Sequence, residues 1–179
     1  RDGIRVVRGG NMIIIGVDPG TAITGYGIVG DDENGNIFAI DYGVITTSSE
    51  LPVELRLKEV YHQVSELLER HHPHSGAVEK LFFKKNVKTA ISVSQARGVV
   101  LLAFANAGIK MNEYAPSEVK SAVTGYGSAN KAQIQAMTKT LLRLKDIPKP
   151  DDAADALAIA ICHLNSSGVN NLVKNMEDT

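Results

Sequence analysis

The first third of the chain has the hydrophobic pattern of three short strands. Residues 12–18 (MIIIGVD) form a β-branched apolar run that is too short for a helix and is followed by Pro19-Gly20, so we expect a buried central strand. Residues 24–30 and 37–47 also have strand-like patterns, and the polar turn between them contains Asn34-Gly35, a hairpin signal. This pattern predicts a three-stranded antiparallel meander.

After Pro52 the hydrophobic period becomes helical. Apolar residues recur at helical spacing from Val53 to Leu68, and Pro73 lies beyond them, which predicts an amphipathic helix. Two further strand patterns, at 77–79 and 109–114, alternate with helical segments at 89–107, 116–123, 131–144 and 152–165. We therefore expect an α/β fold with a mixed five-stranded sheet, three antiparallel strands and then two parallel ones, and helices on both faces.

The length of 179 residues suits one domain. We expect this domain to span residues 12–167. Residues 1–11 are basic and glycine-containing, and we interpret them as an extension or an expression remnant outside the fold. Residues 168–179 are polar and are predicted to form a flexible tail.

The composition is that of an ordinary globular protein, with 44% hydrophobic and 22% charged residues. The one cysteine, Cys162, cannot form an internal disulfide, which favours a reduced, cytoplasmic location. The longest apolar runs, such as residues 99–105, are far shorter than the roughly 18 residues that a membrane span needs. We therefore expect no membrane association.

The net charge of −1 hides an uneven distribution along the chain. Residues 1–79 carry a net charge of −6, residues 80–145 carry +9 and residues 146–179 carry −4. A basic middle between acidic ends can bind a polyanion, although lysines that only solvate helix faces would give the same pattern. Charge by itself leaves these two interpretations open.

Carboxylates stand at the ends of several predicted elements. Asp18 closes the first strand, and Glu79 closes the fourth, which the crossover topology places parallel to and beside the first. Asp152 and Asp155 are three residues apart on one face of the last helix, near its positive end. We assign Asp151 as the N-cap of that helix. Each residue alone has an ordinary structural explanation, as a turn, strand-end or capping residue.

If the last helix begins against the open edge of the sheet, these carboxylates converge and repel one another unless cations neutralise them. Oxygen ligands without His or Cys favour Mg²⁺, or alternatively Mn²⁺, over zinc. Two such ions about 4 Å apart can flank the attacking and leaving oxygens of a phosphodiester displacement. The sequence therefore predicts a two-ion site.

Six motifs, in order and spacing, resemble the RuvC family of Holliday junction resolvases, the crossover junction endodeoxyribonucleases. They are Ile15–Gly20 with Gly25–Gly27, Glu79 with Phe82, Gln95–Gly98, Val119-Lys120, Gly125–Lys131 and Asp152–Ala158. The resemblance covers Met12 to about His163. Lys80 stands where many relatives carry a polar or acidic residue, and residues 1–11 have no counterpart in the family.

This resemblance implies a ribonuclease H-like fold and a homodimer that works with the RuvA and RuvB branch-migration proteins. It also implies Mg²⁺-dependent, symmetric nicking of two strands of like polarity at a four-way DNA junction, leaving 5′-phosphate and 3′-hydroxyl ends, in recombination and repair. By position, the family's catalytic and metal-binding carboxylates match Asp18, Glu79, Asp152 and Asp155.

The resemblance also gives the basic middle a DNA-binding interpretation. Phe82 matches the family's base-stacking aromatic residue, and neighbouring lysines can hold the flanking phosphates, whereas Phe83 is equally consistent with a core residue. Two further lysines match phosphate-contacting positions. The expected DNA-binding residues are Phe82, Lys84, Lys85, Lys120 and Lys131.

The segment 99–105 is apolar nearly all round its predicted helix, which is more than a helix covering a single sheet requires. A second copy of the chain, related by a two-fold axis and presenting the same helix face, would cover the apolar surface that the sheet leaves exposed. We expect a homodimer with Val99, Leu102 and Ala103 at its interface.

Three alternatives differ in class. The chain could be another ribonuclease H-like nuclease that acts on RNA, although the helix from Gln95 and the Lys120 to Lys131 segment argue against this. A sugar kinase or actin-like nucleotide-binding domain shares the fold but needs a second domain, and the chain is too short for one. A junction-binding protein without activity would not need a complete set of carboxylates.

Overall fold

The computed structural model describes residues 12–81 and 87–177, and it describes side chains for residues 12–81 and 90–167. The elements, in chain order, are β1 (Ile13–Asp18), β2 (Ile23–Asp31), β3 (Ile37–Thr46), α1 (Val53–His71), β4 (Ser75–Glu79), α2 (Val87–Asn106), β5 (Lys110–Tyr114), α3 (Pro116–Thr124), α4 (Lys131–Leu141) and α5 (Asp151–Glu177). No helix in this described part of the chain has the length and apolar character needed to cross a membrane.

The five strands form one mixed sheet in the order β3-β2-β1-β4-β5. β1, β2 and β3 pair antiparallel, whereas β4 runs parallel to β1 and β5 runs parallel to β4. In the β2–β3 turn, Gly35 has a φ of 75° and the Asp32 carboxylate accepts hydrogen bonds from the Asn34 and Asn36 backbone amides at 2.9 Å. The predicted meander and the parallel pairing of β4 with β1 are both confirmed.

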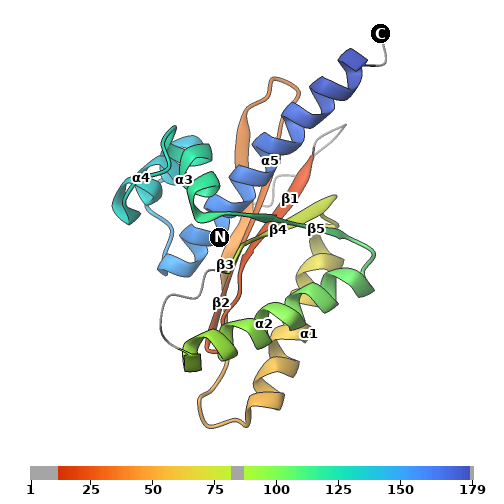
Figure 1. The fold of residues 1–179 in the computed structure, drawn as a ribbon, viewed down its shortest axis with the longest axis vertical. Coiled ribbons are helices and arrows are strands. Elements are labelled where there is room, and N and C mark those ends of the chain that lie inside the picture. The colour runs from red at the N-terminus through yellow and green to blue at the C-terminus, as the bar shows by residue number, and fades with distance from the viewer. Residues whose placement is uncertain (1–11, 82–86, 178–179) are drawn as a thin grey trace.

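Helices cover both faces of the sheet, as predicted (Figure 1). Alternate residues of β1 point to opposite faces, because side chains alternate along a strand. Ile14 packs with the apolar residues of α3 and α5, whereas Ile15 and Val17 pack with those of α1 and α2. Each side of the sheet therefore has its own hydrophobic core.

Glycines in β1 and β2 let α5 lie directly on the sheet. A Cβ atom at Gly16 would overlap the Ala156 carbonyl oxygen, and a Cβ at Gly25 would overlap the Asp152 carbonyl oxygen. Only hydrogen atoms fit between the two backbones at these positions. The glycines thus place the first turns of α5 against the end of β1.

Helix α5 differs from its prediction at both ends. It continues to Glu177 rather than ending at Asn165, because no proline follows Pro150 and a single glycine, Gly168, costs only about 1 kcal/mol in a helix. The backbone is helical to residue 177, whereas the flexibility expected of residues 168–179 stays a prediction. Asp151 is the first helical residue rather than the residue before the helix, so its assignment as the N-cap is wrong.

A buried histidine joins α5 to the parallel strands. His163 is 4% exposed, and its Nε2 lies 2.8 Å from Ser75 Oγ and 3.1 Å from Asn112 Nδ2. Its Nδ1 lies 2.7 Å from Tyr114 OH. The Asn112 amide nitrogen can only donate, so Nε2 accepts and the neutral ring carries its proton on Nδ1. Burial, together with the charge of Lys110, lowers the pKa of His163 from 6.5 to about 4.

We expect His163 to make the protein acid-sensitive. As the pH falls from 6.5 towards 4, the unfolded chain binds a proton at His163 while the folded chain does not, so protonation favours unfolding. Urea denaturation of the wild type and of His163→Gln at pH 4 to 7.5, with EDTA, isolates this contribution. The stability of the wild type relative to the variant should fall by up to about 3 kcal/mol across this window. A constant difference would contradict the prediction.

Candidate active site

Carboxylates meet where the two central strands end. Asp18 is the last residue of β1 and Glu79 is the last residue of β4, and the parallel register pairs the preceding residues, Val17 and Val78. Parallel strands end at the same edge of a sheet, so both carboxylates lie at this edge. With Asp155 from α5, they line a cavity of about 100 Å³.

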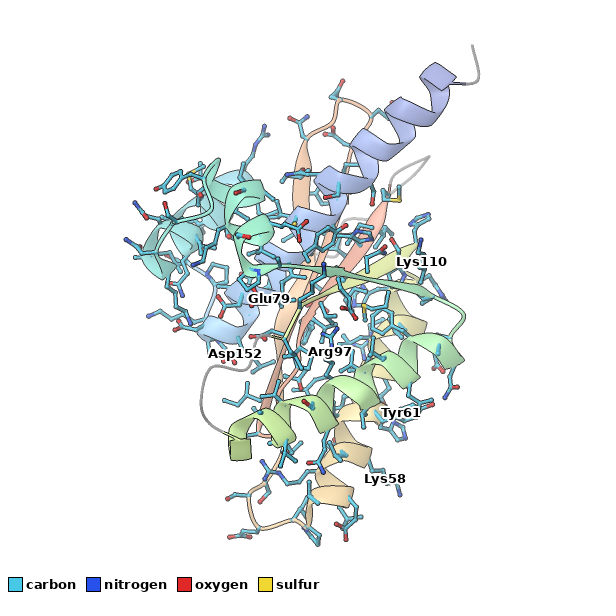
Figure 2. The ribbon with its side chains drawn as sticks, in the orientation of Figure 1. Lys58, Tyr61, Glu79, Arg97, Lys110 and Asp152 are labelled. Carbon is cyan, nitrogen blue, oxygen red and sulfur yellow. The ribbon has the colours of Figure 1, made fainter. Side chains whose placement is uncertain are left out.

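Asp152 comes to the same edge from the first turn of α5. Figure 2 shows Glu79 and Asp152 reaching this region from β4 and α5. The Asp152 backbone lies over Gly25, and its carboxylate acts electrostatically on both Asp18 and Asp155. Three of the four predicted carboxylates thus line one cavity, and the fourth lies close enough to influence two of them.

Burial and mutual repulsion make it unfavourable for all of these carboxylates to be ionised together. Burial raises the pKa of Asp18 to about 7, and the charges of Asp155, Asp152 and Glu79 add to this rise, whereas Lys131 opposes it. Burial is also the main cause of the raised pKa of Glu79 and of Asp155. A cation at this edge would stabilise all of these carboxylates in their charged form.

The donor chemistry fits a hard divalent cation, because the described residues that line the cavity supply carboxylate oxygens and include neither His nor Cys. Within residues 12–81 and 87–177, however, no three His, Cys, Asp or Glu side chains already form a group that could hold a metal ion.

Two lysines border the carboxylates. Lys120 of α3 lines the cavity, and its charge lowers the pKa of Glu79. Lys131, the first residue of α4, lies with its Nζ 3.0 Å from Asp151 Oδ2 and 3.4 Å from Asp155 Oδ2. The side chain of Asp151, which also accepts a hydrogen bond from Gln135 Nε2 at 3.0 Å, thus holds α4 against α5 instead of capping α5.

Lys131 is the first residue of α4, and the capping motif that begins this helix can be recognised in the sequence. Asn130 caps α4 by accepting a hydrogen bond from the Gln133 backbone amide at 3.0 Å, and the Gln133 side chain accepts one from the Asn130 amide at 2.9 Å. This reciprocal pair is a capping box. It fixes the first turn of α4, and with it the base of the Lys131 side chain.

Three of the predicted DNA-binding residues cannot be placed. Phe82, Lys84 and Lys85 lie outside the described residues, as does Phe83.

The three predicted dimer residues do not share one surface. Leu102 is 53% exposed, Val99 is partly buried, and Ala103 is 1% exposed in the core between α2 and the sheet. Ala103 is therefore a core residue, and its assignment to a dimer surface is wrong. The tertiary packing of α2 decides which of its apolar residues turn inward.

One residue beside the site received no role from the sequence. Arg97 of α2 is 9% exposed, and its guanidinium contacts the Glu79 backbone carbonyl and the Glu113 carboxylate. A charged residue between Ala96 and Val100, which are both fully buried, is the local signal that could have indicated its importance.

A mixed five-stranded sheet with helices on both faces and carboxylates at the carboxyl edge of its central strands is the arrangement of ribonuclease H-like nucleases. A sequence model of the family described as crossover junction endodeoxyribonuclease RuvC matches residues 14–163. The chain belongs to this family.

Individual relatives agree with this placement. The crossover junction endodeoxyribonuclease RuvC of Brevibacillus brevis is 57% identical over 152 residues, which cover 85% of this chain and 91% of the relative. The structure of Thermus thermophilus RuvC matches with a TM-score of 0.83 and 35% identity, covering 89% of this chain and 97% of that one. T. thermophilus RuvC in complex with Holliday junction substrate matches with a TM-score of 0.84 and 34% identity, covering 89% and 96%. The predicted family and fold are confirmed, while the domain limits at residues 12 and 167 stay a prediction.

Proposed function

We propose that this chain resolves four-way (Holliday) DNA junctions by nicking two strands of like polarity symmetrically, leaving 5′-phosphate and 3′-hydroxyl ends. The observation that carries this proposal is the joint cavity of Asp18, Glu79 and Asp155, with Lys120 on its wall. T. thermophilus RuvC, whose structure is in complex with Holliday junction substrate, has the same fold and matches 89% of this chain, which supports a junction as the substrate.

Membership of this nuclease family implies dependence on a divalent metal. We propose that Asp18, Glu79, Asp152 and Asp155 hold two Mg²⁺ ions, with Mn²⁺ as an alternative. The ions would supply positive charge at the scissile phosphodiester. The protein's part would be to bring these carboxylates together at the ends of β1 and β4 and the start of α5, and the bound ions would then favour their charged form.

The lysines have a separate part in this proposal. Lys120 would hold a phosphate beside the cavity that it lines. Lys131 forms ion pairs with Asp151 and Asp155 in the free protein, so it would exchange a carboxylate for a phosphate when DNA binds. Phe82, Lys84 and Lys85 are proposed to stack on a base and to hold the flanking phosphates.

Incubation with synthetic substrates in Mg²⁺ tests the proposed function. Four-way junctions should be nicked in pairs, whereas linear duplex and RNA–DNA hybrid of the same sequence should stay intact. Preferential cleavage of the hybrid or of structured RNA would instead favour the ribonuclease alternative. An EDTA control should stop all cleavage.

Lys120→Ala should weaken junction binding and reduce the dependence of log K on log salt concentration by about one unit of slope, because one phosphate contact is lost. Lys131→Ala is expected to do the same. Binding titrations in EDTA at several salt concentrations measure the slope. Lys58→Ala is the matched control, since Figure 2 shows Lys58 on α1, well away from Glu79, and its slope should equal that of the wild type. An unchanged slope in Lys120→Ala would make Lys120 an ordinary surface lysine.

We also propose that the protein is a two-fold homodimer paired through α2, that it works with RuvA and RuvB, and that it acts on DNA in the cytoplasm. The exposed apolar residues of α2 support the pairing, because Ile91 is 55% exposed and Leu102 is 53% exposed. Their spacing of 11 residues puts them on the same helix face. A second copy of this face would remove both side chains from water.

Sedimentation of the DNA-free protein at micromolar concentration should therefore give about twice the chain mass of 19.2 kDa. Leu102→Glu should shift the mass towards a single chain, because a buried unpaired carboxylate destabilises an interface. Ile147→Glu alters another exposed apolar residue, 40% exposed and beyond α4, and should remain a dimer. A monomeric wild type would contradict the pairing.

A further inference from the structure

Arg97 is a nearly buried cation that reaches from α2 to the end of β4. Its side chain is 11% exposed, and Figure 2 shows it between α2 and the sheet near Glu79. Nη1 donates a hydrogen bond to the Glu79 backbone carbonyl oxygen at 2.9 Å, and Nη2 lies 2.5 Å from Glu113 Oε1. Burying a guanidinium is costly, and its partner Glu113, with a side chain 46% exposed, only partly offsets that cost, so we look for a role of Arg97 beyond stability.

The contacted carbonyl lies where β4 leaves the sheet. The last backbone hydrogen bond of β4 with β5 runs from the Lys80 amide to the Tyr114 carbonyl oxygen at 2.7 Å. Arg97 supplies a donor to the Glu79 carbonyl, which belongs to the same peptide group as the Lys80 amide. This peptide group is therefore held on both sides, and its orientation sets the direction in which the Glu79 side chain leaves the backbone.

Glu113 holds the other arm of the guanidinium. Glu113 lies on β5 opposite Val78 of β4, and the next residue, Tyr114, lies opposite Glu79. Because the guanidinium is planar and its nitrogens have fixed directions, anchoring Nη2 on Glu113 fixes the direction in which Nη1 points. A lysine at position 97 has no such fork.

The same helix also contacts the chain just after Asp18. Thr21 Oγ1 donates a hydrogen bond to the Ser92 carbonyl oxygen and accepts one from Ser92 Oγ, both at 2.8 Å. Helix α2 is thus hydrogen-bonded to the segments that carry both strand-end carboxylates.

We propose that Arg97 is a positioning residue that orients Glu79 for binding divalent metal by fixing the peptide group at the end of β4. This inference rests on the proposed function, in which Glu79 is a metal ligand. Groups that orient metal ligands contribute about 10- to 100-fold to metal affinity or activity.

The test measures Mn²⁺ binding to the full chain without DNA by calorimetry. Arg97→Met replaces the apolar stem of the side chain but removes the guanidinium and both donors, and should weaken Mn²⁺ binding by about 10- to 100-fold. Junction binding in EDTA should stay within about twofold of the wild type, because the DNA-binding lysines are untouched. Mn²⁺ binding equal to that of the wild type would overturn the proposal.

Arg97→Lys keeps the charge and covers the case in which Arg97→Met does not fold. We expect it to weaken Mn²⁺ binding by at least threefold, since a lysine cannot hold the carbonyl and the carboxylate in one plane, and equality with the wild type would overturn the proposal. Glu113→Gln keeps an acceptor for Nη2 and should bind Mn²⁺ within about twofold of the wild type. If Glu113→Gln instead loses as much as Arg97→Met, the effect comes from the ion pair and the proposal fails.

A double-mutant cycle separates positioning from general destabilisation. If Arg97 acts through Glu79, Arg97→Lys should have no further effect on Mn²⁺ binding in a Glu79→Ala background. Additive losses would mean that Arg97 acts on the whole site and would overturn the proposal. Failure of the proposed function is a separate result, because it appears as a wild type that does not nick junctions, whatever Mn²⁺ binding shows.

Discussion

Asp18→Asn should abolish junction nicking while junction binding survives. The asparagine side chain has nearly the same shape but lacks the charge needed to hold a divalent cation, whereas DNA binding depends on the basic residues. Nicking assays in Mg²⁺ and gel-shift titrations in EDTA measure the two properties separately. Glu79→Gln and Asp152→Asn should behave in the same way.

The same substitution should stabilise the metal-free protein. The pKa of Asp18 is raised from 3.8 to about 7 in the folded state, so ionisation of Asp18 favours the unfolded chain, and this penalty grows as the pH rises from 4 to 7. Asparagine removes the penalty. In EDTA at pH 8, Asp18→Asn should have a higher melting temperature than the wild type, and the gap should shrink towards pH 4. Wild-type nicking by Asp18→Asn, or a lower melting temperature at pH 8, would contradict the carboxylate cluster.

Gly25→Ala should damage both the fold and the site. The added Cβ atom overlaps the backbone carbonyl oxygen of Asp152, and a backbone atom cannot rotate away as a side chain can. Overpacking of this kind costs about 1 to 3 kcal/mol and moves α5 off the sheet. Because α5 carries Asp152 and Asp155, we expect nicking to fall by more than the loss of folded protein accounts for. Chemical denaturation and nicking rates measure the two effects.

Gly98→Ala is the matched control for stability. A Cβ at Gly98 meets no atom within 4 Å, and the residue lies inside α2, where alanine is favoured over glycine by about 1 kcal/mol. This variant should be as stable as the wild type or more stable. If Gly25→Ala proves equally stable, the close approach of α5 to β2 is not what positions Asp152.

Much of the fold could be predicted because its signals are local. The apolar run of residues 12–18, the Asn34-Gly35 turn and the helical period after Pro52 each depend on neighbouring residues, and all three elements form where predicted. The crossover topology also placed the fourth strand parallel to and beside the first, which the structure confirms, whereas the place of β5 at the edge was not predicted. The ends of these two strands then brought Asp18 and Glu79 to one edge.

Other features depend on residues that are distant in the chain. The partner of Asp151 is Lys131, and no local pattern distinguishes that ion pair from an N-cap. Likewise, the sequence shows that α2 is apolar all round, but only its packing assigns Ala103 to the core and leaves Leu102 exposed.

The sequence by itself therefore determined most of the elements and the pairing of β4 beside β1, which brings Asp18 and Glu79 to one edge. Periodicity and turn chemistry act over short stretches of chain, and parallel crossovers follow a general rule. The tertiary structure alone decided how closely α5 approaches Gly25 and which backbone group Arg97 contacts. These depend on the fit of surfaces from separate elements, where a single Cβ atom or one hydrogen-bond donor changes the outcome.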